Sequence, residues 1–513
     1  MAQSIQESYE SVAYPSNVQP QMHPDRLSVL AKLYSMNPVP IESCRVLELG
    51  CGDGSSLISF ANTLPNATFK GVDIAVNHIE SGNRLIADIG LKNIKLEQAD
   101  VTKLEKSFGE FDFIIAHGFI SWIPDFVREK VFEICSQNLS ENGVAYISYN
   151  TYPGFYHRQI VRDIMRYHVR EIETPYERTK QSADFLKFLT TASNKAETYN
   201  LTLKHELENI TDKPIEILLH DDIAEINQAF YFHEFVSLAE KNNLQFLSEA
   251  DFTQSQDYIY PENVHAFLSH LKNESIVEFE QYIDFIKGRR FRQSLICHKD
   301  IQLKRNANAE SIQEFFIASS AKFQSGKPDL KGRKPEKFSS QNKASATMDN
   351  PLVKAALFHL SQSYPRYVHF DDLLEKARDF SATKTETDAK DLSNYLLEIY
   401  RSGLLELHIF QPPFTTKVSD KPKVSELVRH QLKSTQFITT QRCITINISD
   451  EFSRKLLQLL DGTRDKQALI RDLTVWINST NGKDIEKRKF IEQLPNKVRI
   501  GLEQIANLAL LVE

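Results

Sequence analysis

Three glycines stand within five residues near the start of the chain, in Glu48-Leu49-Gly50-Cys51-Gly52-Asp53-Gly54. The segment follows an apolar run, RVL, and precedes a helix expected to begin at Ser55. Glycine permits positive φ and lets a ligand approach the backbone, while the helix N-terminus behind the loop offers unpaired N–H groups. The spacing therefore predicts a binding site for a nucleotide-like ligand.

Two kinds of ligand suit such a loop. A dinucleotide such as NAD is typical of GxGxxG, whereas S-adenosylmethionine is typical of (E/D)xGxGxG. Here Ser55 stands where the third dinucleotide glycine would be, and Glu48 would repel a pyrophosphate but attract an ammonium and a sulfonium group. The pattern favours S-adenosylmethionine, although a purely structural turn between a strand and a helix can contain the same glycines.

Two further carboxylates follow the next two expected strands. Asp73 ends GVD, where a carboxylate can accept hydrogen bonds from both ribose hydroxyls. Asp100 ends QAD and can accept from an adenine amino group, with the ring lying among Ile74, Ala99 and Val101. Either aspartate could instead cap the next helix. Three acidic residues that end successive strands of one sheet favour a shared ligand.

The expected elements place these residues in one sheet. Apolar runs at 45–49, 68–72, 93–98, 111–116 and 144–149 alternate with helices expected at 55–62, 76–88 and 126–137. Such alternation predicts an α/β fold, a Rossmann-like parallel sheet with helices on both faces and its ligand at the carboxyl ends of the strands. Two later strands, in NNLQFLSEADF and RRFRQSLICHK, are expected to complete this sheet.

The remaining patterns divide the chain into seven segments. We expect an N-terminal cap at 1–43, two parts of the sheet domain at 44–157 and 220–300, a helical insertion at 158–219, a connector and basic linker at 301–349, a winged-helix-like regulatory domain at 350–415 and a small C-terminal domain of similar, winged-helix-like type at 416–513. The insertion contains no glycine and suits a dimer contact or a wall of the acceptor site. The linker is rich in Ser, Lys and Pro, which predicts a solvated hinge.

The motifs ELGCGDG, GVD, QADV and FDFIIAHG resemble those of class I S-adenosylmethionine-dependent methyltransferases. More narrowly, SYNTYPGF and YFHEFVSLAEKNNLQFLSEADF resemble bacterial methyltransferases with a C-terminal methyltransferase regulatory domain, and most of all the rickettsial protein lysine methyltransferases that act on outer membrane protein B. The resemblance implies S-adenosylmethionine as the cofactor and a protein lysine as the acceptor. It also implies cofactor roles for Glu48, Gly50, Gly52, Gly54, Asp73 and Asp100, and for the backbone at His117 and Gly118.

Methyl transfer from a sulfonium mainly requires alignment of the nucleophile, so neither a catalytic triad nor a metal is expected. A lysine amine with a pKa of about 10.4 must first lose its proton, which costs about 4.6 kcal/mol at pH 7 and is favoured in a dry aromatic channel. We expect this channel in the loops after the fourth and fifth strands, with Trp122, Asn150 and Tyr152. Tyr14 and Tyr149 are the candidates whose hydroxyls orient the amine, while core packing is the ordinary role of such aromatic residues.

Composition disfavours several other classes. The 513 residues include 61 Lys and Arg against 68 Asp and Glu, so no basic surface for nucleic acid is indicated. A DNA base methyltransferase would be expected to carry an NPPY-type motif after the fourth strand, where this chain has AHGFIS. Five scattered cysteines predict neither disulfides nor a zinc site, and no signal-like start or long apolar run is present.

The sequence thus predicts a cytoplasmic methyltransferase that forms a homodimer, and the family resemblance implies that it modifies lysines of a large protein, such as a bacterial outer membrane protein before export. Two alternatives stay open. One is a small-molecule methyltransferase with the same sheet, and the other is a non-catalytic S-adenosylmethionine sensor that binds a partner through its winged helix.

Overall fold

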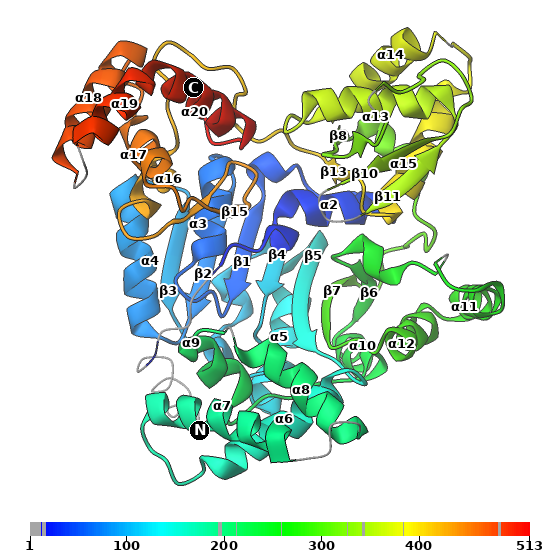
Figure 1. The fold of residues 1–513 in the computed structure, drawn as a ribbon. Helices are drawn as coiled ribbons and strands as arrows, with labels where there is room; N and C mark the ends of the chain where they lie inside the picture. The colour runs from blue at the N-terminus through cyan, green and yellow to red at the C-terminus, as the bar shows by residue number, and fades with distance from the viewer. Residues whose placement is uncertain are drawn as a thin grey trace.

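The computed structural model describes residues 12, 17–192, 197–211, 213–257, 259–325, 327–340, 344–382, 384–480 and 484–512, so the candidate Tyr14 lies outside the described residues. A seven-stranded sheet in the order β3-β2-β1-β4-β5-β7-β6 forms its centre (Figure 1). The strands are β1 (Arg45–Leu49), β2 (Thr68–Asp73), β3 (Ile94–Gln98), β4 (Phe111–Ala116), β5 (Leu139–Asn150), β6 (Leu244–Glu249) and β7 (Phe291–His298). The first five strands are parallel, and β7 runs antiparallel to both β5 and β6. The predicted α/β sheet, including its last pair of strands, is confirmed.

Helices cover both faces of the sheet, because alternate residues of each strand point to opposite sides. One face packs against α2 (Pro24–Leu33), α3 (Ser55–Thr63) and α4 (Val76–Ile89), and includes Val46, Phe113 and Tyr146. The other face packs against α5 (Asp125–Asn138) and α10 (Phe232–Lys241), and includes Leu47, Ile114 and Ile147.

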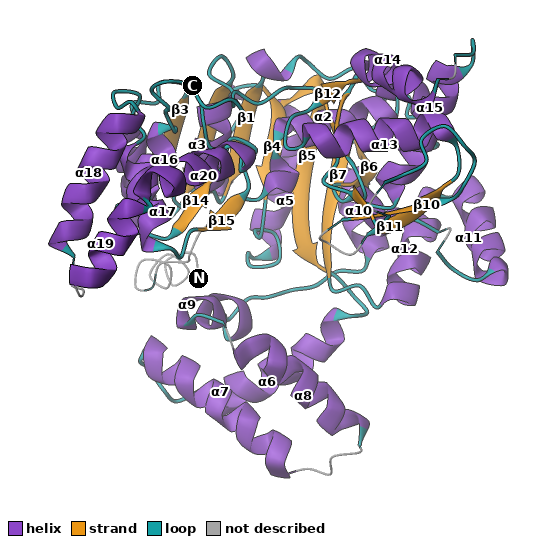
Figure 2. Cartoon of the chain, turned by 45° about the horizontal axis from the view of Figure 1, so that its top comes forward, coloured by secondary structure: helices purple, strands orange, loops and turns teal. Residues whose placement is uncertain are grey.

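The insertion after β5 is helical, as expected, and has a core of its own. It contains α6 (Phe155–His168), α7 (Pro175–Ala192), α8 (Thr198–Thr211), α9 (Ile215–Ile217) and a π-helical turn at Leu218–Asp222. Val161, Leu186 and Leu203 are fully buried within it. Figure 2 shows α6, α7 and α8 standing apart from the sheet. Two further helices, α11 (Glu262–Glu274) and α12 (Ile276–Lys287), lie between β6 and β7 in the chain.

The Ser- and Lys-rich segment that we predicted to be a solvated hinge is folded. It contains β8 (Phe316–Ala318), β9 (Lys322–Phe323), β10 (Glu336–Ser339) and β11 (Ser345–Met348). Strands β9, β10 and β11 form a small sheet in which Phe338 is fully buried, with its ring centroid 3.8 Å from that of Phe323. These two phenylalanines form the apolar face of the small sheet, which the mostly polar composition of the segment did not predict.

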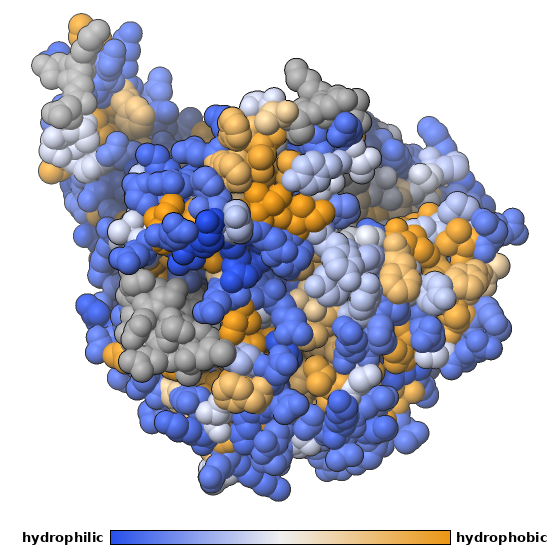
Figure 3. Space-filling view, turned by 90° about the horizontal axis from the view of Figure 1, so that it is seen from below, coloured by the Kyte–Doolittle hydropathy of each residue, from blue (hydrophilic) through white to orange (hydrophobic). Residues whose placement is uncertain are grey.

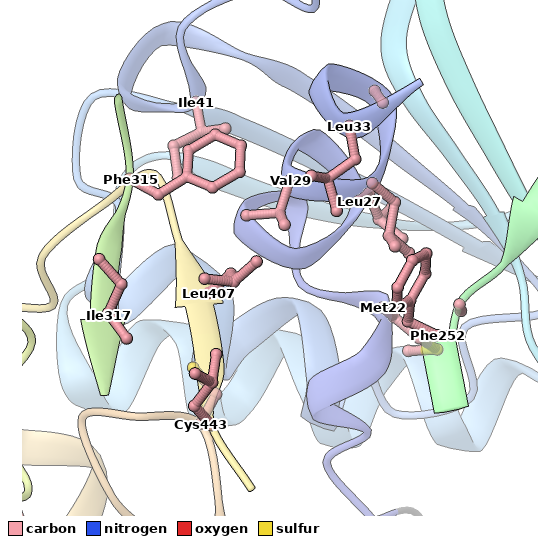
Figure 4. Close-up of a cluster of buried hydrophobic side chains, with 14 of the residues drawn as sticks. Met22, Leu27, Val29, Leu33, Ile41, Phe252, Phe315, Ile317, Leu407 and Cys443 are labelled. Carbon is pink, nitrogen blue, oxygen red and sulfur yellow. The ribbon is translucent and has the colours of Figure 1, made fainter. Parts of the chain in front are cut away.

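We use the name middle unit for residues 301–410. Its β8 pairs with β12 (Val368–His369) and β13 (Glu406–His408), and its helices are α13 (Pro351–Ser363), α14 (Phe370–Ser381) and α15 (Asp388–Arg401). Figure 4 shows Val29 and Leu33 of α2 beside Phe315 and Leu407. The core of the middle unit is therefore continuous with that of the sheet domain.

The C-terminal domain has a separate core. Its elements are α16 (Glu426–Gln431), β14 (Phe437–Thr439), β15 (Thr445–Asn447), α17 (Glu451–Leu459), α18 (Lys466–Ser479), α19 (Asp484–Glu492) and α20 (Leu494–Asn507). Helix α16 lies against α4 of the sheet domain (Figure 1). Among the described residues of the whole chain, no helix is both long and apolar enough to cross a membrane.

Candidate active site

The Gly-rich loop between β1 and α3 has a backbone that requires its glycines. Gly50, Gly52 and Gly54 have φ of 71°, 55° and 73°, which is the left-handed region that other residues rarely adopt. A Cβ at Gly50 would lie 2.5 Å from the ring of Phe119, and a Cβ at Gly54 would lie 2.7 Å from Leu96. The loop could therefore not hold its shape with larger residues at these positions.

The two predicted aspartates lie beside this loop. The carboxylate of Asp73 accepts hydrogen bonds from the backbone N–H groups of Gly52 and Ala75, both at 2.9 Å. One oxygen of Asp100 accepts from the backbone N–H of Thr102 at 2.9 Å and from its hydroxyl at 2.7 Å. Asp100 thus caps a short 3₁₀ turn, which was its alternative role, and it faces the cavity as well.

Glu48 is a buried acid one residue before the end of β1. Its side chain is only 5% exposed, and one of its carboxylate oxygens has no hydrogen-bond partner among the described residues. Burial, together with the negative charges of Asp53 and Asp73, raises the pKa of Glu48 from 4.5 to about 8. A ligand with a positive charge near this oxygen would stabilise the ionised form.

A cavity of about 320 Å³ opens at the carboxyl ends of β1 to β4. This volume lies within the usual range for a ligand site. The predicted residues that line it are Glu48, Gly50, Cys51, Gly52, Asp73, Ile74, Ala99, Asp100, Val101, His117, Gly118 and Trp122. Gly54 does not line the cavity and instead forms the N-cap of α3.

His117 follows β4 and faces the cavity as a neutral ring. Its Nδ1 lies 3.0 Å from the hydroxyl of Tyr146 and 3.1 Å from that of Ser148. Burial lowers its pKa from 6.5 to about 4. The Ser148 hydroxyl also accepts from the backbone N–H of Gly118 at 2.7 Å, so β5 positions the loop after β4.

Three predicted channel residues do not line the cavity. Tyr149, expected to orient the acceptor, is fully buried, with its hydroxyl 3.2 Å from Ser294 and its ring stacked on Phe235. The side-chain amide of Asn150 donates to Asn227, and the ring of Tyr152 stacks on Tyr156. Because side chains alternate along a strand, Tyr149 lies on the same face of the sheet as Ala145 and Ile147. This face packs against α5 and α10.

Several lining residues were missed from the sequence. The segment before α2 contributes Asn17, Gln19 and Met22, and the start of α5 and the loop before it contribute apolar side chains, among them Ile123, Phe126 and Val127. Phe119 also lines the cavity, in the loop after the fourth strand where the channel was expected. Ile217 and Asp221 come from the end of the insertion. No motif marks the positions that were missed.

Comparisons with known proteins agree with this geometry. Residues 41–212 match the model of a methyltransferase domain, residues 215–298 that of a predicted methyltransferase regulatory domain, and residues 420–510 that of the PKMT C-terminal winged helix domain. The uncharacterized protein RP789 of Rickettsia prowazekii is 34% identical over 98% of this chain and 93% of its own length. The structure of PKMT2 from Rickettsia typhi matches 98% of this chain and 100% of its own, with a TM-score of 0.86 and 27% identity.

The chain belongs to the class I S-adenosylmethionine-dependent methyltransferases of the rickettsial PKMT type. A second structure of PKMT2, in complex with AdoHcy, matches equally well, with a TM-score of 0.86. S-adenosylmethionine is the cofactor of this methyltransferase, and the buried carboxylate of Glu48 fits a cationic ligand of that kind.

The family models also locate the regulatory domain and the winged helix domain in the chain. The regulatory-domain model covers 215–298, which includes α10, β6 and β7 of the central sheet, whereas we expected the regulatory domain at 350–415. The winged-helix model covers 420–510, which lies in the small C-terminal domain that we expected to be of winged-helix-like type. The three helices and small sheet of the middle unit explain why its sequence pattern resembles a winged helix.

Proposed function

We propose that this methyltransferase modifies lysine side chains of a large protein, such as a bacterial outer membrane protein before its export. The observation that carries this proposal is a row of exposed and half-buried aromatic side chains at the edge of the sheet that holds the cavity. The resemblance to the rickettsial protein lysine methyltransferases supports the same acceptor.

The aromatic row consists of Phe267, Tyr282, Phe285, Tyr231, Tyr152 and Tyr156. Successive ring centroids are 5.2, 5.6, 6.2, 5.3 and 4.1 Å apart. Phe267, Phe285 and Tyr156 are each at least 45% exposed. Figure 3 shows hydrophobic side chains on the side of the molecule that carries α11 and α12.

Contiguous exposed apolar surface of this kind is typical of protein interaction sites, and tyrosine is a frequent residue in them. The row ends at Tyr152 and Tyr156, which follow the carboxyl end of β5, and the cavity opens at the same edge of the sheet beside β4. A protein bound along the row would therefore extend toward the cavity. A small-molecule acceptor would make no use of this surface.

The site is proposed to align the acceptor with the methyl group of the cofactor and to exclude water. S-adenosylmethionine supplies the methyl group and its own leaving group, so the chain mainly holds the acceptor in line. Phe119, Trp122 and Phe126 form an apolar wall of the cavity. Such a wall disfavours the charged form of a lysine amine, which must lose its proton before it can act as the nucleophile.

The test is to incubate the purified enzyme with methyl-labelled S-adenosylmethionine and a bacterial outer membrane protein, then map the modified residues by mass spectrometry. We expect label on lysines of that protein and none when the Asp73→Ala variant is used. Transfer to small amines or metabolites with no label on any protein would contradict the proposed acceptor and favour the small-molecule alternative.

We further propose that the methyltransferase acts in the cytoplasm as a homodimer. All five cysteines are free and buried, which suits a reducing compartment. The insertion exposes Tyr167, Tyr176, Phe188 and Leu201, which suits contact with a second copy. Light scattering of the wild type and of a Tyr167→Ser, Phe188→Ser double variant tests the dimer, and a monomeric wild type would contradict it.

A further inference from the structure

Three tyrosines, Tyr152, Tyr156 and Tyr231, form one end of the aromatic row, and we use the name tyrosine cluster for them. The ring of Tyr152 stacks on that of Tyr156 at 4.1 Å and lies 5.3 Å from that of Tyr231, at an angle of 47°. The hydroxyls of Tyr156 and Tyr231 are 3.4 Å apart. Phe285 adds a fourth ring, whose centroid lies 6.2 Å from that of Tyr231 at an angle of 75°. Tyr156 is 47% and Phe285 46% exposed, so both rings offer surface to a ligand.

Two exposed carboxylates flank the tyrosine cluster. Glu234 lies at the start of α10, where one of its oxygens accepts a hydrogen bond from the backbone N–H of Tyr231 at 2.8 Å. Asp163 follows Tyr156 by seven residues in α6, which places both on the same side of that helix. Burial, together with the charges of Tyr156, Glu234 and Asp163, raises the pKa of Tyr152. The two carboxylates therefore give the cluster a negative potential.

Aromatic faces and nearby carboxylates together favour a cationic ligand. Aromatic rings attract ammonium groups, and groups of exposed rings are typical binding sites for quaternary ammonium ligands. Methylation of a lysine keeps its positive charge and replaces N–H groups, which water hydrates strongly, by methyl groups. We propose that the tyrosine cluster binds a methylated lysine of the acceptor protein, which is the product of the reaction. This inference rests on the proposed function, because it assumes that the acceptor is a protein lysine.

Product binding at the tyrosine cluster holds the acceptor on the enzyme after a methyl transfer. Tyr152 follows the carboxyl end of β5, and the cavity opens at the carboxyl ends of β1 to β4, so the cluster and the cavity lie at the same edge of the sheet. A lysine that is already methylated can occupy the cluster while another lysine of the same protein enters the cavity. No covalent bond forms or breaks at the cluster. Arg290, whose backbone carbonyl accepts from Thr151 just before Tyr152, does not offer a free cation there, because its guanidinium is paired with Glu206.

The experiment measures binding of three short peptides by calorimetry. The enzyme is loaded with S-adenosylhomocysteine, which has no methyl group to transfer, so no reaction accompanies binding. The peptides differ in one side chain only, which ends in an ammonium, a trimethylammonium or a neutral tert-butyl group. We expect the trimethylammonium peptide to bind about fivefold more tightly than the tert-butyl peptide, as for a cation on exposed aromatic faces. It should also bind more tightly than the ammonium peptide, because less hydration is lost.

Variants of the tyrosine cluster show where the cation binds. The double variant Tyr156→Leu, Tyr231→Leu removes two aromatic faces but keeps apolar side chains, so the preference for the charged peptide over its neutral counterpart should disappear. Tyr156→Phe, Tyr231→Phe keeps the rings and should keep the preference. Glu234→Gln should weaken binding of the two charged peptides alone, since a glutamine can still cap α10. Tyr395→Leu is the matched control, because Tyr395 is 39% exposed on α15 of the middle unit. If the double variant unfolds early, the single variant Tyr156→Leu should still lose most of the preference.

Two results would overturn the product site. Equal affinity of the wild type for the trimethylammonium and tert-butyl peptides would leave only an apolar surface. An unchanged preference in Tyr156→Leu, Tyr231→Leu would locate the cation elsewhere, for example in the cavity. These results are independent of the labelling experiment. Label on lysines of a protein without a preference for the charged peptide would support the acceptor and overturn the product site, whereas the preference without label on any protein would support the product site and contradict the acceptor.

Discussion

At the scale of single residues, the buried carboxyl of Glu48 lowers the stability of the cofactor-free enzyme, and we propose that its ionised form binds the cofactor. Its pKa of about 8 means that the folded protein without cofactor keeps a proton that the unfolded chain has already lost above pH 4.5. Because the folded state binds more protons between pH 4.5 and pH 8, the free energy of unfolding falls as pH rises through this window. Below pH 4.5 both states are protonated and the effect disappears.

We expect Glu48→Gln to raise the free energy of unfolding of the cofactor-free enzyme more at pH 8 than at pH 4.5. The difference between the two pH values should be a few kcal/mol, since each pH unit within this window contributes about 1.4 kcal/mol. The same change should weaken binding of S-adenosylmethionine, because a neutral amide attracts a cation less than a carboxylate does. Urea unfolding at the two pH values and calorimetry measure the two effects, with the exposed Glu42→Gln as the control. Equal stabilisation at both pH values would contradict the raised pKa.

Asp73 lines the cavity and accepts a hydrogen bond from the Gly-rich loop. We expect Asp73→Ala to weaken cofactor binding by about a hundredfold, because it removes a carboxylate that we propose binds the ribose and that also accepts from two backbone N–H groups of this region. The fold should survive, as judged by a native melting profile. Calorimetry with S-adenosylmethionine gives the result, and Glu80→Ala on the exposed side of α4 is the control. Unchanged affinity would contradict the ribose assignment.

At the scale of elements, α4 supports the Gly-rich loop from behind. Gly82 lies in the middle of this helix, where a glycine costs about 1 kcal/mol relative to alanine. The structure gives the reason, since a Cβ at Gly82 would lie only 2.2 Å from the backbone oxygen of Asp53. The glycine lowers the stability of the helix itself but allows close contact between the helix and the Gly-rich loop.

Gly82→Ala should therefore destabilise the enzyme by about 1–3 kcal/mol, the usual cost of overpacking, despite the better helix propensity of alanine. It should also weaken cofactor binding, because Asp53 must move and Gly52 and Gly54 move with it. Thermal unfolding and calorimetry test both effects. The exposed neighbour Ser81→Ala is the matched control, and a stabilised Gly82→Ala enzyme with normal affinity would contradict the close contact.

At the scale of the whole molecule, a polar junction connects three parts of the chain. The guanidinium of Arg442 in the C-terminal domain donates to Glu406 at 2.7 Å and to the hydroxyl of Tyr364 at 2.5 Å, both in the middle unit. Asp25, at the start of α2, accepts from the backbone N–H of Ile409 at 2.7 Å and lies 2.5 Å from Nδ1 of His408. The segment just before α2 lines the cofactor cavity, so the junction holds that segment in place.

We expect Arg442→Met to lower the free energy of unfolding by about 3 kcal/mol, the usual effect of removing one partner of a buried ion pair. It should also weaken cofactor binding slightly, because the contact between the domains supports α2. Chemical unfolding and calorimetry measure these changes, and Arg471→Met on the exposed side of α18 is the control. A fully stable Arg442→Met enzyme would show that the junction does not hold the domains together.

The sequence by itself determined the sheet and the cofactor loops. Glycine spacing and acidic residues at strand ends are local patterns, and the carboxyl ends of parallel strands must meet at one edge of a sheet. Glu48, Asp73 and Asp100 were therefore predictable although 52 residues separate the first from the last. Phe338 and the folded linker were not, because one buried and one partly buried phenylalanine among Ser and Lys leave no periodic signal.

Only the tertiary structure showed which residues from distant segments line the rest of the cavity. Tyr149 and Tyr146 lie in the same strand, yet the period of two points them to opposite faces, and the sequence does not say what covers each face. Asp221 reaches the cavity because the insertion folds back on its own core and ends beside β4 and the cofactor loops. Contacts between segments so distant in sequence depend on packing of the whole chain, which no local pattern records.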